Sequence, residues 1–142
     1  MDNLPIIIEQ IYAAPVAKVW EALTDKEKME EWYFDIKGFI AEEGKTFDFD
    51  VEDGGNLYHH HFEILEVIPN KKLRHTWTHP GHSKGRSVLT WVLEPVGKGT
   101  KVTLIHEGVE NFSDAGDGFT KENYIKGWNE ILGKWLKDFL EK

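Results

Sequence analysis

The chain has 142 residues, carries a formal net charge of −8 and contains no cysteine. Its length predicts one domain over residues 1–142, which is large enough to bury a core without disulfides. The lack of thiols excludes disulfides, cysteine metal ligands and cysteine nucleophiles. The acidic balance argues against binding to nucleic acids or to anionic membranes.

Targeting signals do not stand out in the sequence. No apolar run approaches the roughly 20 residues of a membrane span. The first ten residues, MDNLPIIIEQ, lack a basic region followed by a long apolar stretch, so we see no signal peptide. We therefore expect a cytoplasmic protein without a membrane partner.

The first part of the chain predicts one strand and two short helices. The β-branched run Ile6–Tyr12 is typical of a strand. Pro15 suits the first turn of a short amphipathic helix, where its missing N–H is not needed. Either Thr24 or Asp25 then caps a second short helix, Lys26–Trp32.

After Gly38, apolar and polar residues alternate as they do in half-buried strands. The predicted strands are Phe47–Val51, Leu57–Ile68, Leu73–His79, Ser87–Glu94 and Lys101–Gly108. The turn signals between them lie at Asp53–Asn56, Pro69–Asn70, Pro80–Gly85 and Pro95–Thr100. Within the second strand the apolar parity changes near Ile64, which predicts a bulge or twist there.

The last part of the chain changes character twice. The segment Asn111–Phe119 is polar and contains glycines, so we expect a loop. From about Thr120 the apolar period becomes 3.6, which predicts a long amphipathic helix. Its apolar stripe contains Tyr124 or Ile125, Trp128, Ile131, Leu132, Trp135, Leu136 and Phe139.

The order of the elements predicts an α+β fold. A curved antiparallel sheet of about six or seven strands needs a cover for its apolar face, and the long C-terminal helix is the obvious cover. A strongly curved sheet that grips one helix usually leaves a cavity between them. Aromatic side chains, which make up 13% of the residues, would fill the core or line that cavity.

Four stretches of the sequence resemble a known family, in the same order. They are APVAKVWEALTDKEKMEEWY, FEILEVIPNKKLRHTW, TWVLEPVGKGTKVTLIHEG and GWNEILGKWLKDFLEK. They are similar to the domain at the C-terminus of the activator of the heat-shock protein 90 ATPase, which belongs to the START-like, helix-grip superfamily. The resemblance covers nearly the whole chain and implies the helix-grip fold.

The resemblance also implies a function class. Members of the superfamily bind lipids, sterols, polyketides or other apolar molecules in the cavity, and some act as cyclases or dehydratases. We therefore expect a domain that binds a small apolar or aromatic molecule, with no cofactor. A cavity enzyme that uses an inward histidine, a co-chaperone and a homodimer stay open as alternatives. Phe62 occupies a position where the family often has glycine, so we expect it to reduce or reshape the cavity.

A run of three histidines lies in the strand predicted at 57–68. Strand alternation turns His60 inward with Tyr58 and Phe62, and turns His59 and His61 toward solvent. A specific metal site normally needs a third or fourth ligand beyond this outward pair, of which Glu63 could supply one. We therefore predict solvated outer histidines and no metal site.

The candidate cavity combines inward histidines with aromatic side chains. A histidine in an apolar pocket has its charged form disfavoured, and it can serve there as a neutral base or a hydrogen-bonding group. The predicted cavity residues are Trp32, Phe47, Phe49, Tyr58, His60, Phe62, His75, Trp77, Trp91, His106 and Trp128. We assign no catalytic residue. Asp48 and Asp50 are expected on the solvated outer face of their strand.

Overall fold

The structure, a computed structural model, describes residues 4–34, 36, 38–53, 55–80, 83–115 and 121–141. Within them, six strands form one antiparallel sheet in the order β1-β6-β5-β4-β3-β2. The elements in chain order are β1 (Ile6–Tyr12), α1 (Val16–Thr24), α2 (Lys26–Trp32), β2 (Thr46–Asp53), β3 (Asn56–Ile68), β4 (Lys72–Trp77), β5 (Ser87–Val96), β6 (Gly99–Glu107), η1 (Val109–Ala115), α3 (Lys121–Glu130), η3 (Ile131–Leu136) and α4 (Lys137–Leu140).

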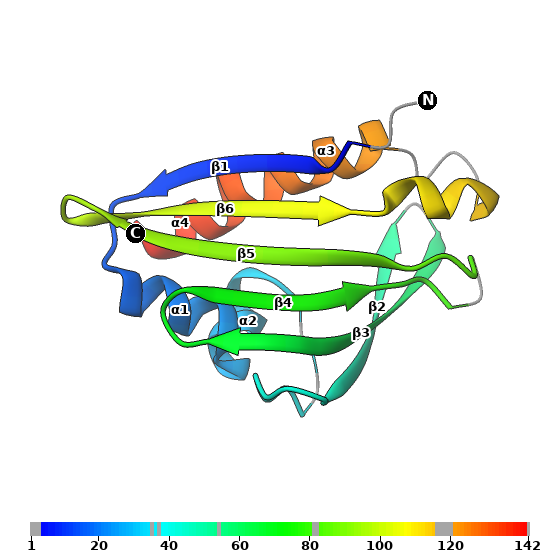
Figure 1. The fold of residues 1–142 in the computed structure, drawn as a ribbon, viewed down its shortest axis with the longest axis horizontal. Helices are drawn as coiled ribbons and strands as arrows, with labels where there is room; N and C mark the ends of the chain where they lie inside the picture. The colour runs from blue at the N-terminus through cyan, green and yellow to red at the C-terminus, as the bar shows by residue number, and fades with distance from the viewer. Residues whose placement is uncertain are drawn as a thin grey trace.

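The sheet and the C-terminal helix form the two main layers. Figure 1 shows the continuous helical segment α3-η3-α4 running behind β1, β6 and β5, while α1 and α2 lie beside it at one end of the sheet. The strands β2 and β3 bend away from the plane of the other strands (Figure 1). This is the α+β arrangement predicted from the order of the elements, and it is the helix-grip fold that the resemblance implies, so both expectations are confirmed.

Local signals in the sequence position the two short helices as predicted. The side chain of Asp25 accepts hydrogen bonds from the backbone N–H groups of Glu27 at 2.9 Å and Lys28 at 3.4 Å, so Asp25 is the N-cap of α2. The other candidate, Thr24, instead donates its hydroxyl to the carbonyl of Trp20 at 2.8 Å. Capping satisfies backbone donors that have no partner within the helix.

Strand β3 contains the predicted irregularity. Its register with β4 shifts between Ile64 and Glu66. Before the shift, Phe62 and Ile64 are buried, and residues 56–63 pair with β2. The adjacent strand β4 is shorter than predicted, because it ends at Trp77 and only an isolated bridge joins Thr78 to β3.

Two predicted connections differ from the structure. The segment expected to be a loop from Asn111 begins inside the 3₁₀ helix η1, and residues 116–119 lie outside the described residues. The cause is visible in the spacing, because Val109 and Phe112 are both buried and three residues apart, which matches one 3₁₀ turn. The predicted turn Pro95–Thr100 is also shorter, since only Gly97 and Lys98 separate β5 from β6.

The predicted C-terminal helix is present but is not uniform. Its first predicted residue, Thr120, lies outside the described residues, and α3 begins at Lys121. The middle of the helix, η3, has the wider π-helical turn. There the carbonyl of Leu132 accepts a hydrogen bond from the hydroxyl of Tyr12 at 2.7 Å, which joins β1 to the helix. A wider turn often leaves a carbonyl to be satisfied by a side chain.

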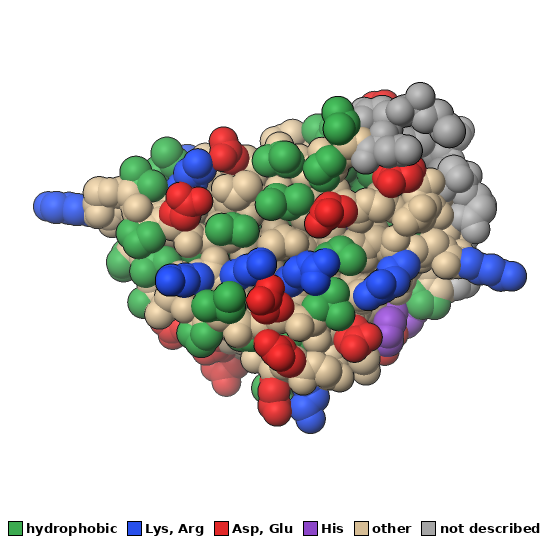
Figure 2. Space-filling model, in the orientation of Figure 1, with side chains coloured by type: hydrophobic (Ala, Val, Ile, Leu, Met, Phe, Trp, Pro, Cys, Tyr) green, Lys and Arg blue, Asp and Glu red, His purple; other side chains and the backbone are tan. Residues whose placement is uncertain are grey.

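The face of the sheet that lies away from the helix has a mixed surface. Figure 2 shows hydrophobic side chains scattered over this face and a row of basic side chains across its middle. Ile7 and Ile11 on β1 are 60% and 57% exposed, and Lys101 pairs with Glu9 at 3.0 Å. No helix among the described residues is long and apolar enough to cross a membrane.

Candidate functional site

An open groove of about 430 Å³ lies between α3 and one end of the sheet. Its volume falls within the usual range of small-molecule sites, roughly 300–1,000 Å³. The groove is lined by Phe34, Val51, Tyr58, His60, Trp77, His79, Asn123, Tyr124, Lys126, Gly127, Trp128, Glu130 and Ile131. Aromatic and apolar side chains thus form much of the wall, and polar side chains of α3 complete it.

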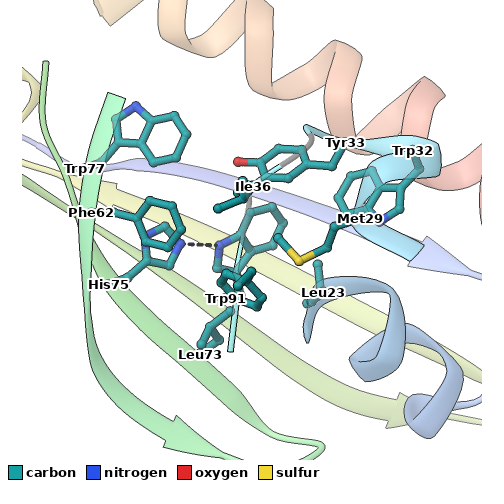
Figure 3. Close-up of a pocket in the computed structure, with 11 residues that line it drawn as sticks. Leu23, Met29, Trp32, Tyr33, Ile36, Phe62, Leu73, His75, Trp77 and Trp91 are labelled. Carbon is teal, nitrogen blue, oxygen red and sulfur yellow. Dashed lines mark hydrogen bonds between the residues drawn. The ribbon is translucent and has the colours of Figure 1, made fainter. Parts of the chain in front are cut away.

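A second, much smaller cavity lies deeper in the fold, beside α2 and β4. It measures about 20 Å³, which is room for about one water molecule. Its lining consists of Leu23, Met29, Trp32, Tyr33, Ile36, Phe39, Phe62, Leu73, His75, Trp77 and Trp91, most of which are labelled in Figure 3. Phe62 occupies part of the wall, so the space next to it is far too small for a drug-sized ligand.

The predicted site residues divide between these two spaces. Those that line the groove are Tyr58, His60, Trp77 and Trp128, and those that line the inner cavity are Trp32, Phe62, His75, Trp77 and Trp91. The remaining three pack against members of these walls. Phe49 stacks on His60 with ring centroids 4.7 Å apart, Phe47 contacts Phe62 at 5.5 Å, and His106 contacts Trp128 at 6.0 Å.

His106 sits in a chain of hydrogen bonds with a fixed direction. The Ser87 hydroxyl donates to the carbonyl of Trp77 at 2.7 Å, so it must accept from Nε2 of His106 at 2.8 Å. Nδ1 of His106 then accepts from the indole N–H of Trp128 at 3.1 Å. The serine therefore does not give its proton to the histidine, and this pair is not an activated nucleophile.

His75 is held in the same neutral state with the opposite tautomer. Its Nδ1–H donates to the carbonyl of Thr76 at 2.9 Å, and its Nε2 accepts from the indole N–H of Trp91 at 3.3 Å (Figure 3). Burial lowers the pKa of His75 to about 4 and the pKa of His106 to about 3. The unprotonated nitrogen of each ring already accepts a hydrogen bond from an indole N–H. Neither histidine is therefore placed to take a proton from a ligand.

The groove contains a different pair of histidines. His60 donates Nδ1–H to the carbonyl of Tyr58 at 3.0 Å, which makes its Nε2 the acceptor nitrogen of the neutral ring. His79 lies 4.7 Å from His60, centroid to centroid, and its Nε2 is hydrogen-bonded to the hydroxyl of Tyr124. Burial raises the pKa of Tyr124 above its ordinary value, so this hydroxyl stays protonated at neutral pH.

The two outward histidines of the run form an exposed network with β2. His59 contacts Asp50 through Nδ1 at 2.7 Å and Asp48 through Nε2 at 3.0 Å, and His61 contacts Asp48 through Nδ1 at 2.8 Å. The hydrogen bond to Asp50 raises the pKa of His59. Burial acts to raise the pKa of Asp48, but bonds from both histidines outweigh it and lower that pKa. Within the described residues no group of three or more side chains is arranged to hold a metal ion.

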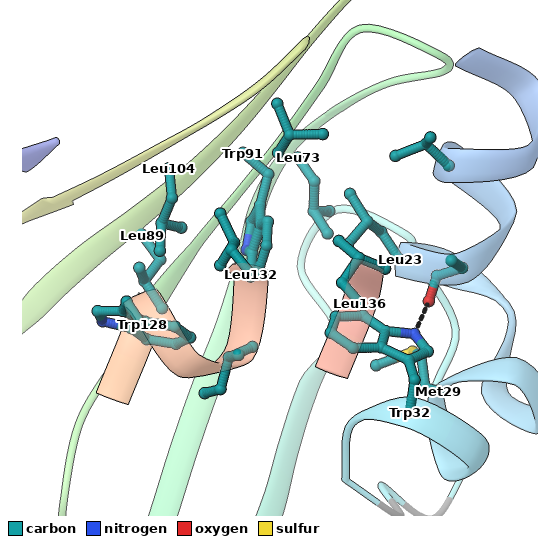
Figure 4. Packing of buried hydrophobic residues seen from close by; sticks show 14 of the residues in the cluster. Leu23, Met29, Trp32, Leu73, Leu89, Trp91, Leu104, Trp128, Leu132 and Leu136 are labelled. Carbon is teal, nitrogen blue, oxygen red and sulfur yellow. Dashed lines mark hydrogen bonds between the residues drawn. The ribbon is translucent and has the colours of Figure 1, made fainter. Parts of the chain in front are cut away.

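Indole hydrogen bonds separate the tryptophans of the site into two kinds. Trp32 donates to the carbonyl of Ala22 at 2.7 Å (Figure 4), and Trp91 and Trp128 donate to their histidines. The buried indole nitrogen of Trp77 and the buried hydroxyl of Tyr33 have no hydrogen-bond partner among the described residues. A buried polar group without a partner costs about 1–3 kcal/mol of stability.

The sequence prediction missed several lining residues. One set could have been found, because Tyr124, Gly127 and Ile131 share with the predicted Trp128 the i, i+3, i+4, i+7 spacing of one helix face. The other set, Tyr33 and Phe34, directly follows α2, and no periodic pattern marks it.

The chain matches a known family over most of its length. The model of the family described as "Activator of Hsp90 ATPase homolog 1-like protein" matches residues 13–141. Among curated proteins no sequence matches the chain.

Solved structures with the same fold come from several bacteria. A protein from Chromobacterium violaceum has a TM-score of 0.83 at 22% identity, with 100% of this chain and 99% of that chain covered. CalU16 from Micromonospora echinospora has a TM-score of 0.72 at 29% identity, with 96% and 75% covered. The Aha1 dimer from Colwellia psychrerythraea has a TM-score of 0.71 at 26% identity, with 97% and 96% covered.

Proposed function

Because the chain belongs to the activator of Hsp90 ATPase homologue 1-like family, we propose that it binds a small apolar or aromatic molecule in the groove between α3 and the sheet. The observation that carries this proposal is the groove itself, about 430 Å³ in volume and walled by Phe34, Trp77 and Trp128. Aromatic walls bury flat ligands well, because large ring faces come into contact at a small cost in side-chain entropy.

The polar groups of the groove support an uncharged ligand with few hydrogen-bonding atoms. His60 and the His79–Tyr124 pair already satisfy part of their hydrogen-bonding capacity within the protein. The charged residues Lys126 and Glu130 line the groove from exposed positions on α3. A ligand is therefore held mainly by its apolar surface, and its affinity depends on the space available beside α3.

Gly127 provides a direct test, because it lines the groove and a Cβ built there meets no atom within 4 Å. The variant Gly127→Leu fills the groove without strain in the backbone. We expect it to weaken the binding of 1-naphthol, measured by isothermal titration calorimetry, by about tenfold or more, since the buried contact area is lost.

A matched control exists in the same helical segment. Gly133 is exposed and outside the groove lining, and a Cβ there comes only within 4.0 Å of Gln10. Gly133→Leu should leave the affinity for 1-naphthol within about twofold, while both variants gain helix propensity over glycine. Equal affinity in the wild type and Gly127→Leu would show that the probe does not use the groove and would refute the proposal.

A further inference from the structure

We propose that the groove and the inner cavity are two parts of one binding site separated by the side chain of Trp77, and that its ligand is a flat aromatic molecule with an oxygen atom that hydrogen-bonds to Tyr33. This inference rests on the proposed function of the groove. It adds a movable partition, an inner subsite and a chemical feature of the ligand.

The position of Trp77 defines the partition. Among the described residues that line the two spaces, Trp77 is the one shared by both. On the groove side its ring meets His60 at 5.0 Å and Trp128 at 5.5 Å, centroid to centroid. On the other side it meets Phe62 and His75 at 6.4 and 6.0 Å. A rotation of this one side chain therefore changes the wall between the groove and the inner cavity.

The hydrogen bonds of the neighbouring tryptophans show why Trp77 is the ring that can move. The indoles of Trp32, Trp91 and Trp128 each donate to a protein acceptor, so turning any of them breaks a buried hydrogen bond. The indole nitrogen of Trp77 has no partner among the described residues, so its rotation breaks none. Its backbone stays fixed, because its carbonyl accepts from Ser87 and its residue pairs with β5.

Tyr33 supplies the inner end of the site. Figure 3 shows its hydroxyl directed inward, between Ile36 and the ring of Trp77. This hydroxyl is buried and has no partner among the described residues. Burial also raises its pKa, so it is a neutral phenol that can both donate and accept.

The surroundings of Tyr33 favour a ligand oxygen over a water molecule. A buried water needs two to four polar partners. Apart from the indole N–H of Trp77, the other polar side chains of the inner cavity are already engaged, since Trp32 donates to Ala22, and His75 and Trp91 bond to each other. The phenol of Tyr33 alone can satisfy an oxygen on an apolar ring, whereas a water would need the indole N–H of Trp77 as well. An aromatic ring also exceeds the 20 Å³ available, so its entry requires Trp77 to turn toward the groove.

The chemical part of the proposal is tested with a matched pair of probes, 1-naphthol and 1-methylnaphthalene. We expect the wild type to bind 1-naphthol about fivefold more tightly, as one buried hydrogen bond allows. Tyr33→Phe should bind both probes with the affinity that the wild type has for 1-methylnaphthalene. A preference for 1-naphthol that persists in Tyr33→Phe overturns the proposal.

The partition is tested by the rate of binding. In stopped-flow experiments Trp77→Phe, which has the smaller ring, should associate with 1-naphthol about fivefold faster than the wild type, because the entry step no longer waits for the indole. Trp20→Phe, which changes a half-buried tryptophan outside both linings, should leave the rate unchanged. Trp77→Leu serves as a second variant in case the first does not fold. Unchanged rates in the folded Trp77 variants overturn the partition.

The two proposals fail in different ways. If Gly127→Leu abolishes binding while Tyr33→Phe keeps the preference for 1-naphthol, the groove binds the ligand and the inner subsite is refuted. If Gly127→Leu has no effect while Tyr33→Phe removes the preference, the ligand reaches Tyr33 by another route, and both the groove and the partition are refuted. If the wild type binds neither probe, both proposals are refuted for this class of ligand.

Discussion

The histidines on the two faces of the sheet have opposite surroundings. On the inner face His75 and His106 are buried, neutral and hydrogen-bonded to tryptophans. On the outer face His59 and His61 are part exposed and hydrogen-bonded to the carboxylates of β2. The same side chain is therefore a fixed neutral component of the core on one face and a carboxylate-bonded surface group on the other.

The contrast between the two faces shows that strand alternation decides the surroundings of each histidine in this fold. His59 and His60 are neighbours in the sequence, yet the first meets Asp48 and Asp50 while the second stacks on Phe49. Desolvation lowers the pKa of the buried His75, whereas a carboxylate partner raises the pKa of the outward His59. Three predictions test this contrast, in order of decreasing effect.

The largest effect is expected from His106→Leu. This change leaves the buried indole N–H of Trp128 without an acceptor and breaks the chain through Ser87. We expect a loss of about 3 kcal/mol in the free energy of unfolding, measured by urea denaturation. His59→Leu is the matched change on the outer face and should cost less than about 1 kcal/mol. Equal losses would contradict the contrast between the faces.

A medium effect is expected from pH. The folded pKa of His75, about 4, lies below its ordinary value of 6.5. Below pH 6.5 His75 therefore binds a proton in the unfolded chain but not in the folded chain, and the free energy of unfolding falls as pH drops toward 4. Compared with His75→Gln, which does not titrate, the wild type should lose about 1.4 kcal/mol per pH unit between pH 6 and 4.5. Parallel curves of unfolding free energy against pH would contradict burial of a neutral His75.

The smallest effect has the opposite sign. The pKa of His59 is raised in the folded state, so its contribution is present below about pH 6.5 and is lost as pH rises through the folded value. The contacts of His59 with Asp48 and Asp50 are exposed. Solvent screening therefore keeps their contribution to the free energy of unfolding below about 1 kcal/mol. His59→Asn should therefore be slightly less stable than the wild type at pH 6 and equal to it at pH 8.5, and 1 M salt should remove the difference.

Strand parity was the part of the site that the sequence could predict. Apolar residues at every second position separated His60 from its two neighbours, and the change of parity near Ile64 located the bulge. Both follow from a period of two that one buried face enforces. The same logic placed His75 and His106 inward, where both are buried.

The features of the site that the sequence did not predict depend on contacts between segments that are distant in the sequence. Tyr33 became a lining residue only because α2 packs beside β4 and β5, and no local pattern shows that. The wider turn η3 was also missed, because hydrogen bonds that span one residue more than in an α-helix barely disturb an apolar stripe that contains Leu132 and Leu136. Hydrogen bonds between tryptophan and histidine need both partners in place, so composition alone cannot show them.

The missing side chain at Gly127 has a consequence for how ligand choice could diverge among proteins of this fold. A Cβ at this position meets no atom, and the backbone of α3 there is helical. Successive substitutions at this one position, from alanine to leucine, can therefore narrow the groove in steps without disturbing the core beneath it. Ligand capacity and folding can thus be selected separately at this residue.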